Sequence, residues 1–176
     1  MTRIIAGEWR GHPLPKLKTG SVRPTTDRAR TILFDTLRDV MDMHVLDLYS
    51  GTGALGFEAL SRGAVSLTSI DRDSKYIHEQ KLWMTNRDRL FKAYVGDVQG
   101  ILRKLDHKFD LILADPPYAE QLSEKLIHLI ETHAAENAYF VYESARNNES
   151  TLDSDVFKLL KEKVVAETKI RIYKAN

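Results

Sequence analysis

Four consecutive residues in the second half of the chain could bind and orient a flat amino group. They follow an apolar run at 109–114, and they are Asp115, Pro116, Pro117 and Tyr118. Two prolines fix the backbone and remove its donors, so nearby carbonyl groups stay free to accept hydrogen bonds. An aromatic amine is a poor nucleophile, and hydrogen bonds to Asp115 and to the Pro116 carbonyl would favour the geometry in which its lone pair attacks. The ring of Tyr118 offers a face on which an extruded base can stack.

A second segment predicts a site for a nucleoside cofactor. The pattern G-x-G-x-x-G occurs at 51–56, between a strand-like run at 45–49 and a helix-like run. Asp71 ends the next strand-like run, 71 minus 51 or 20 residues after Gly51, where a carboxylate would bind the ribose hydroxyls. The expected cofactor-binding residues are Asp47, Tyr49, Ser50, Gly51, Thr52, Gly53, Asp71, Arg72, Asp97 and Val98.

Three aspartates indicate which cofactor this loop binds. Asp47 lies near the end of the first expected strand, Asp71 ends the second, and Asp97 follows the third. Their carboxylates would repel the pyrophosphate of a dinucleotide. S-adenosylmethionine carries a sulfonium and an ammonium group and no phosphate, so we expect it here. In that interpretation Asp47 lies near the methionine part, Asp71 binds the ribose and Asp97 binds the adenine amine; alternatively, Asp47 and Asp97 only cap turns.

The apolar pattern predicts the elements that position these residues. Strand-like runs alternate with helix-like runs, which is typical of βαβ units and of a parallel sheet with helices on both faces. The strand-like runs are 45–49, 65–71, 91–95, 109–114 and 138–142, and the helix-like runs are 54–62, 73–86, 98–105 and 119–134. Two further strand-like runs, 157–165 and 168–174, are too close together for a crossover helix and must pair antiparallel. We predict a single α/β domain with a doubly wound, seven-stranded sheet and one antiparallel strand near its C-terminal edge.

Basic residues are concentrated at the N-terminus. The 176-residue chain has a net charge of +1, yet residues 1–30 carry seven basic and two acidic side chains. We expect residues 1–24 to form a flexible basic arm that lies along phosphates, and residues 25–176 to form the domain that binds S-adenosylmethionine. Charge alone fits a solvated tail equally well.

Composition excludes several classes of site. The chain has no cysteine, which excludes disulfides, thiolate zinc sites and covalent attack by a thiolate. The histidine spacing does not favour a metal site either, so we expect none. No apolar run is long enough for a membrane helix or a signal peptide. We therefore expect a cytoplasmic protein with no membrane partner.

Together these motifs resemble those of class I methyltransferases that act on amino groups of planar systems. The RsmD family is more similar still, because the resemblance includes segments 3–11 and 23–30 and covers essentially the whole chain. That family methylates the exocyclic N2 of one guanine in bacterial 16S ribosomal RNA, within an assembled or nearly assembled small subunit. The resemblance implies a target amine at Asp115 and Pro116 and a monomeric enzyme. The RNA contacts it implies are Arg3, Arg10, Arg23, Thr26, Arg28 and Arg30.

Other interpretations stay open at this point. Methylation of adenine N6 or of a glutamine amide is the nearest, although the corresponding turn then usually begins with Asn. A nicotinamide dehydrogenase would explain only the glycine pattern, and a non-catalytic RNA-binding assembly factor would explain the basic segment. Two departures from the family pattern concern the C-terminal edge: residues 166–169 contain no glycine, and residues 147–155 leave little room for a helix. Glu143 could reach the cofactor crevice or pair with Arg146.

Overall fold

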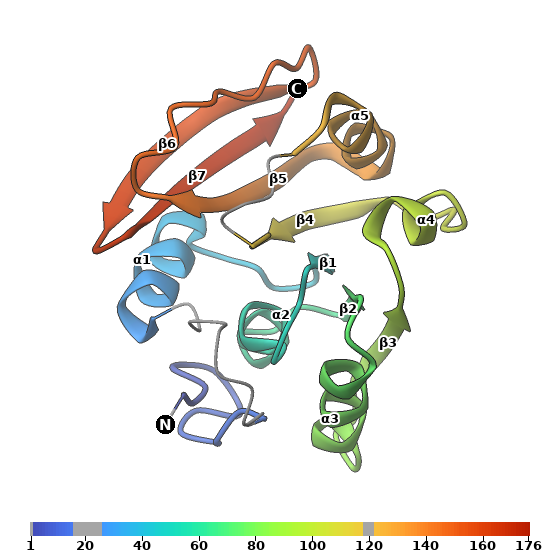
Figure 1. Cartoon of the computed structure of the whole chain (residues 1–176). Coiled ribbons are helices and arrows are strands. Elements are labelled where there is room, and N and C mark those ends of the chain that lie inside the picture. Colours follow the sequence, from blue (N-terminus) through green and yellow to red (C-terminus); the bar gives the residue numbers. More distant parts are fainter. Residues whose placement is uncertain (1, 16–25, 118–121) are drawn as a thin grey trace.

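The computed structural model describes residues 2–15, 26–117 and 122–176. In these residues seven strands form one sheet with the order β3-β2-β1-β4-β5-β7-β6 (Figure 1). The strands are β1 (His44–Leu48), β2 (Ser66–Asp71), β3 (Leu90–Val95), β4 (Phe109–Ala114), β5 (Ala134–Ala145), β6 (Phe157–Val165) and β7 (Thr168–Ala175). The helices are α1 (Asp27–Leu37), α2 (Ala54–Ser61), α3 (Ser74–Met84), α4 (Val98–Leu102) and α5 (Glu124–His133).

The strand directions confirm the predicted fold class. Strands β3, β2, β1, β4 and β5 are parallel to one another. Strand β7 is antiparallel to both of its neighbours, β5 and β6. One reversed strand next to the C-terminal edge of an otherwise parallel sheet is the class I methyltransferase arrangement. Among the helices described, none combines the length and the apolar character needed to cross a bilayer.

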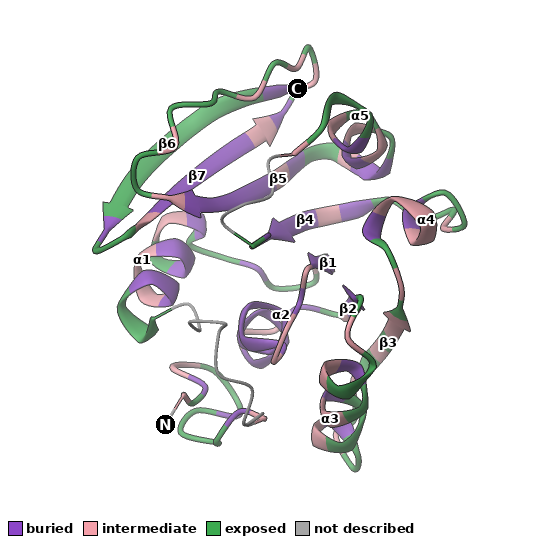
Figure 2. Cartoon of the chain, viewed as in Figure 1, coloured by how far each residue is buried: buried purple, intermediate pink, exposed green. Residues whose placement is uncertain are grey.

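Helices cover both faces of the sheet and bury two apolar clusters (Figure 2). Helices α1, α2 and α3 pack on one face, where Leu33, Phe57 and Val141 are buried. Helices α4 and α5 pack on the other face, around Leu126 and Phe140. The central strands β1 and β4 are buried on both sides, which explains why their sequences are nearly continuous apolar runs.

The C-terminal hairpin forms without the glycine that we expected before the last strand. Strands β6 and β7 are joined by residues 166–167, with Val165 paired to Thr168. Ala166 adopts a φ of 53°, the left-handed conformation that glycine adopts more easily. The segment between β5 and β6 contains no helix, as its short length predicted. The departures from the family pattern therefore change this edge locally and leave the strand order intact.

Residues 2–15 form a packed hairpin, which we call the N-terminal hairpin. The Ile4 N–H donates to the His12 carbonyl (2.9 Å), and the Gly11 N–H donates to the Ile4 carbonyl (2.9 Å). Ile4, Trp9 and Leu14 are buried in the same cluster as the side chains of α1, α2 and α3. The prediction of a flexible arm is therefore wrong for residues 2–15, because their apolar side chains belong to the core.

Candidate active site

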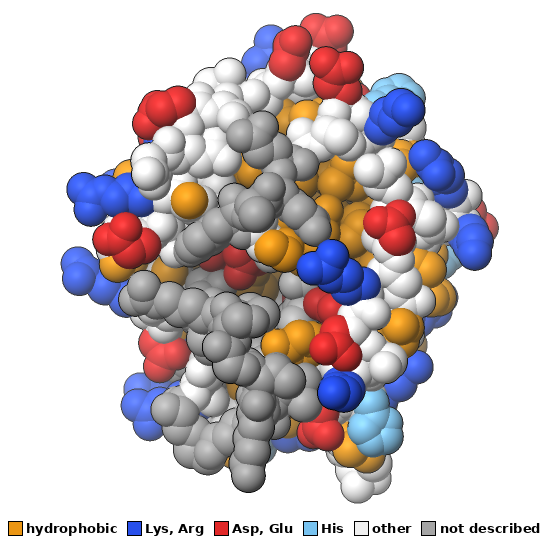
Figure 3. Space-filling model, viewed as in Figure 1, with side chains coloured by type: hydrophobic (Ala, Val, Ile, Leu, Met, Phe, Trp, Pro, Cys, Tyr) orange, Lys and Arg blue, Asp and Glu red, His pale blue; other side chains and the backbone are white. Residues whose placement is uncertain are grey.

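The predicted site residues lie at the carboxyl ends of the central strands. Strand β1 pairs with β2 on one side and with β4 on the other, so the strand order reverses between β1 and β4. In doubly wound folds, ligands bind in the crevice outside the strand ends at such a point. Figure 3 shows a hollow with acidic side chains near the carboxyl end of β4. The fold thus brings the glycine loop and the Asp-Pro-Pro turn to one crevice.

The loop after β1 makes a sharp turn into α2. Tyr49, Gly51 and Gly53 adopt φ values of 58°, 51° and 79°. The Gly53 N–H donates to the Ser50 carbonyl (2.7 Å), and α2 begins at the next residue. Tyr49 carries a side chain at a φ value that only a small fraction of non-glycine residues adopt, and such strain is common at ligand-binding turns. Among residues 2–15, 26–117 and 122–176, a Cβ atom at Gly51 would meet only the Tyr49 carbonyl oxygen, at 3.9 Å, so these residues leave this part of the backbone open to a ligand.

Asp71 fixes this loop from the end of β2. Its Oδ2 accepts a hydrogen bond from the Gly51 N–H (2.8 Å), and its Oδ1 accepts one from the Asp73 N–H (2.8 Å). A carboxylate has about four acceptor positions, so each oxygen retains room for a ribose hydroxyl. Arg72 follows at an exposed position. The predicted ribose-binding carboxylate therefore has a second role that the sequence did not suggest, which is to hold the glycine loop in place.

Gln80 is a site residue that the sequence analysis missed. Its Nε2 donates to the Ser50 hydroxyl (2.9 Å) and to the Gly51 carbonyl (2.8 Å). The side chain is fully buried, on a face of α3 that the apolar spacing marks only as core. The signal that could have found it is a glutamine at an otherwise apolar helical position. A buried amide needs partners, and here the glycine loop after β1 provides them.

The remaining predicted cofactor-binding residues lie at or near the strand ends where the pattern placed them. Asp97 is the N-cap of α4, and its Oδ2 accepts a hydrogen bond from the Gly100 N–H (2.9 Å). Asp97 is exposed and Val98 is buried beside it, while Thr52 is half-buried in the loop. The structure thus assigns Asp97 the capping role that we considered as its alternative. Its contact with an adenine amine stays a prediction.

Asp47 is the most deeply buried carboxylate of the crevice. It is 1% exposed, and its Oδ2 accepts a hydrogen bond from the Gly56 N–H (3.1 Å). A Cβ atom at residue 56 would lie 2.9 Å from Oδ2 and 2.7 Å from Leu67 Cδ1, which explains the third glycine of the pattern. Burial raises the pKa of Asp47 from 3.8 to about 8, and the carboxylates of Asp115 and Asp71 add to the rise. Without a ligand, Asp47 therefore retains its proton at neutral pH.

The Asp-Pro-Pro turn begins directly after β4. Asp115 is half-buried, Pro116 is buried and Pro117 is exposed. Strands β1 and β4 are adjacent and parallel, with Leu48 paired to Ala114, so the glycine loop and the Asp-Pro-Pro turn begin side by side. An amine held at Asp115 would therefore be near the loop that follows β1. Tyr118 lies outside the described residues, so stacking of a base on its ring stays a prediction.

Two of the predicted RNA-binding arginines line a shallow hollow beside the N-terminal hairpin. The hollow has a volume of about 310 Å³ and is lined by Arg3, Ile4, Ile5, Arg10, Gly11 and Asp27. Arg3, Arg10 and Arg28 are exposed, and Thr26 caps α1 by accepting a hydrogen bond from the Ala29 N–H (3.2 Å). Arg23 lies outside the described residues. The exposed guanidinium groups are free to approach phosphate, so their RNA contact stays a prediction.

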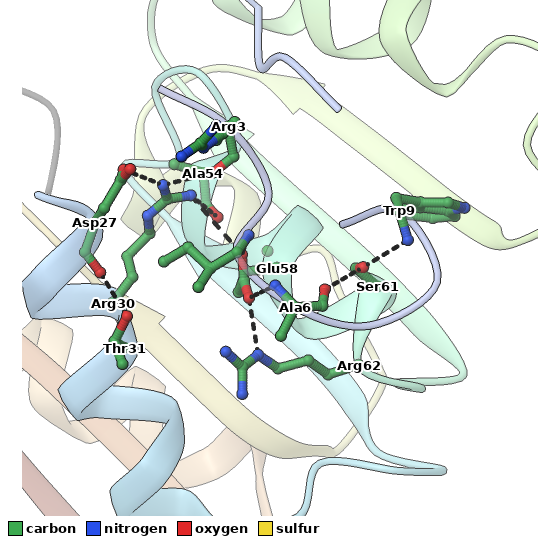
Figure 4. A network of polar contacts seen from close by, with 12 residues as sticks. Arg3, Ala6, Trp9, Asp27, Arg30, Thr31, Ala54, Glu58, Ser61 and Arg62 are labelled. Atoms are coloured by element: carbon green, nitrogen blue, oxygen red, sulfur yellow. Dashed lines mark hydrogen bonds and ion pairs between the residues drawn. The ribbon is translucent and has the colours of Figure 1, made fainter. Parts of the chain in front are cut away.

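Arg30 does not fit the predicted RNA contact, because its guanidinium is fully buried. It donates to the Arg3 carbonyl (2.8 Å), to the Ala54 carbonyl (3.4 Å) and to Asp27 (2.7 Å), as Figure 4 shows. It also lies 4.0 Å from the buried carboxylate of Glu58. We therefore correct the role of Arg30: it connects the N-terminal hairpin to the first residue of α2.

Glu58 completes this connection from the other side (Figure 4). Its carboxylate accepts hydrogen bonds from the Ile5 N–H (2.8 Å) and the Ala6 N–H (3.0 Å). It also accepts one from Arg62 Nε (2.8 Å). A buried carboxylate with these donors has its charge compensated. No local sequence pattern indicates this pairing, because the hairpin partners are more than 50 residues away.

Comparisons with known proteins agree with this geometry. A family model described as "Conserved hypothetical protein 95" matches residues 2–174, which is nearly the whole chain. The chain belongs to this family, the RsmD family of the sequence analysis. The resemblance inferred from the two motifs is confirmed.

Relatives within the RsmD family are similar over most of their lengths. "Ribosomal RNA small subunit methyltransferase D" from Escherichia coli K12 is 34% identical over 97% of this chain and 88% of its own length. The protein of the same name from Haemophilus influenzae is 32% identical over 97% of this chain and 92% of its own. The solved structure of "Putative methyltransferase yhhF" from Escherichia coli is 30% identical, with a TM-score of 0.85, and covers 99% of this chain and 97% of that chain.

Proposed function

We propose that this RsmD-family protein transfers a methyl group from S-adenosylmethionine to the exocyclic N2 of guanine 966 in 16S ribosomal RNA. The coarser part, an S-adenosylmethionine-dependent rRNA methyltransferase, has the support of relatives named as small-subunit rRNA methyltransferases. The choice of guanine N2 and of an assembled or nearly assembled small subunit is the proposal. The observation that carries it is the pairing of Leu48 with Ala114 across the adjacent parallel strands β1 and β4, which brings the predicted amine-binding turn and the predicted cofactor loop to one crevice.

The residues of the crevice fit S-adenosylmethionine. Asp71 and the open backbone at Gly51 suit the ribose, and the buried Asp47 lies at the loop that would hold the charged methionine part. A sulfonium and an ammonium group favour the ionised form of nearby carboxylates, whereas a pyrophosphate would be repelled by them. When bound, this cofactor supplies a methyl carbon that accepts the amine lone pair while the electrons of the C–S bond stay on sulfur.

The residues of the turn would prepare the amine for that step. Asp115 and the Pro116 carbonyl accept its two N–H groups, which holds the nitrogen pyramidal with its lone pair directed at the methyl carbon. These hydrogen bonds strengthen as positive charge develops on nitrogen, so they act mainly in the transition state. The methylated amine is then a strong acid and loses its extra proton to Asp115 or to water. Positioning and exclusion of water therefore carry the catalysis, and no strong base is needed.

The direct test is methyl transfer to small subunits and to protein-free 16S rRNA that lack the modification, followed by digestion and nucleoside analysis. We expect N2-methylguanosine as the product, with faster transfer to subunits than to the free RNA. N6-methyladenosine or a methylated glutamine would establish the nearest alternative instead. RNA binding without any transfer would identify a non-catalytic assembly factor and contradict the proposal.

Replacing both Arg3 and Arg10 by alanine is expected to weaken RNA binding and to reduce its salt dependence. The two guanidinium groups are exposed on one hollow, and each lost phosphate contact lowers the slope of log K against log salt by about 0.7 to 0.9. The summed decrease is therefore about 1 to 2, with cofactor affinity unchanged.

The matched control removes the same charge elsewhere. Arg103 and Lys104 are exposed at the end of α4, on the opposite face of the sheet from α1, and replacing both by alanine should leave the slope unaltered. Equal slopes in the two double variants and the parent would show that the hollow does not bind RNA.

A further inference from the structure

Glu143 lies beside the Asp-Pro-Pro turn, although its sequence neighbourhood does not decide its role. Tyr142 of β5 is paired with Ala114, the last residue of β4. Tyr142 is followed by Glu143 within β5, and Ala114 is followed by Asp115 at the start of the turn. Neighbouring strands lie about 4.8 Å apart. Glu143 is therefore the residue of β5 that adjoins Asp115 across the sheet.

The strand register also places Glu143 on the same face as Asp47. Leu113 is paired with both Asp47 and Val141, so these three side chains share one face. Side chains alternate along a strand, which puts Glu143 on the face of Val141. Its antiparallel partner Ile170 belongs to the apolar cluster of that face. Asp47 of β1 and Glu143 of β5 thus lie on one side of the sheet, with β4 between their strands.

Burial makes an acidic residue at this position costly. Glu143 is only 2% exposed, and its strand neighbours Val141 and Ile170 are apolar. A buried carboxylate needs hydrogen-bond donors to offset its desolvation. A carboxylate beside Asp115 is suited to a substrate that presents donors at two adjacent positions.

We propose that Glu143 determines the base specificity of this site by accepting a hydrogen bond from guanine N1–H, while Asp115 accepts from the N2 amine. The inference rests on the proposed methylation of guanine N2. Guanine presents N1–H and the N2 amine side by side on its Watson–Crick edge. Adenine presents an acceptor at N1, which a carboxylate repels. Glu143 would thus act on binding and orientation of the base, and the methyl transfer itself would use the residues already described.

The test is a substrate that keeps the amine and changes its neighbour. In 2-aminopurine the amine at C2 is retained, whereas N1 is an acceptor. The probe is the small subunit reconstituted with RNA that carries guanine or 2-aminopurine at the target position. We expect the parent protein to prefer guanine in kcat/KM by about 10- to 100-fold, which corresponds to about 1.4 to 2.8 kcal/mol and lies within the range of a good base contact. Glu143→Gln should lose guanine activity and gain 2-aminopurine activity, because the amide can donate to N1, so the preference falls at least tenfold.

Two further variants separate specificity from folding. Glu143→Asp retains a carboxylate and should keep the preference for guanine at a lower rate. Glu136 is exposed on the same strand, and Glu136→Gln should behave as the parent. If Glu143→Gln kept the parental preference, the inference would be overturned, while N2-methylguanosine formation by the parent would still support the proposed function. If the parent modified no guanine, both would fail.

Discussion

Asp115→Ala is expected to lose most methyl transfer and to retain cofactor binding. The carboxylate accepts a hydrogen bond that strengthens as the amine becomes positive, and loss of one such contact lowers kcat by about 100- to 1,000-fold. The side chain is half-buried at the end of β4, so its truncation leaves the strand and the core intact. Because Asp115 contributes to the raised pKa of Asp47, its removal should also lower that pKa and leave cofactor affinity equal or higher.

The measurement is the single-turnover rate of methyl transfer at saturating cofactor. Asp115→Asn retains one acceptor oxygen and should keep partial activity, between alanine and the parent. Asp153 is exposed in the segment between β5 and β6, and Asp153→Ala provides the control for a lost surface carboxylate. If Asp115→Ala transferred the methyl group at the same single-turnover rate as the parent protein, the proposed role of the turn would be contradicted.

Asp47→Asn is expected to change stability and cofactor affinity in opposite directions. The pKa of Asp47 is about 8 in the folded protein, compared with 3.8 for an unperturbed aspartate carboxyl group. Between these values the unfolded chain has lost the proton that the folded protein keeps. The free energy of unfolding of the cofactor-free protein therefore falls as pH rises from about 4 to about 8. An asparagine keeps an acceptor for the Gly56 N–H and has no ionisable group. In the variant, this residue therefore no longer lowers the free energy of unfolding as pH rises.

Cofactor affinity should depend on pH in the opposite direction to stability, because it depends on the ionised form of the same carboxyl group. The positive charges of S-adenosylmethionine favour the ionised form, so binding releases a proton and the affinity increases with pH towards 8. Asp47→Asn should lower the affinity by about 1.5 to 3 kcal/mol, the range for hydrogen bonds to charged groups.

Two measurements check both halves of this prediction. Denaturant unfolding from pH 5 to pH 9 gives the stability, and calorimetry in buffers of different ionisation enthalpy counts the protons released. Asp35 is exposed on α1, and Asp35→Asn should resemble the parent in both. An affinity that is independent of pH in the parent, with no proton release, would show that Asp47 does not respond to the cofactor.

The layers of the fold could be predicted because they depend on local patterns. Buried parallel strands read as apolar runs, and the helices between them read as amphipathic runs, so the βαβ order is visible in the chain itself. Element ends were less accurate. Strand β5 spans Ala134–Ala145 rather than 138–142, because Ala134 pairs with Phe109 of β4 at one end and pairing with β7 continues the strand to Ala145 at the other. That pairing joins distant residues and leaves no local signal.

The site could be predicted where its residues are contiguous and not where they meet through folding. The glycine loop and the Asp-Pro-Pro turn are short motifs with the chemistry in neighbouring residues. Gln80 and Glu58 act through partners 29 to 53 residues away, and nothing in their sequence neighbourhood indicates those partners. The prediction that Arg30 contacts RNA was wrong because charge alone does not distinguish exposed from buried arginines, and Arg30 is buried.

The N-terminal hairpin has a consequence for the order in which the protein folds during synthesis. Its hydrogen-bond partners come much later in the chain. The Ile5 N–H donates to Glu58, and the Pro13 carbonyl accepts from the indole N–H of Trp83 (2.7 Å). Until α2 and α3 have formed, the apolar side chains of Ile4 and Trp9 have no core to enter, and exposed apolar surface on a nascent chain promotes aggregation. The N-terminal hairpin thus leaves the ribosome before the helices that anchor it, and it can pack only after they have formed.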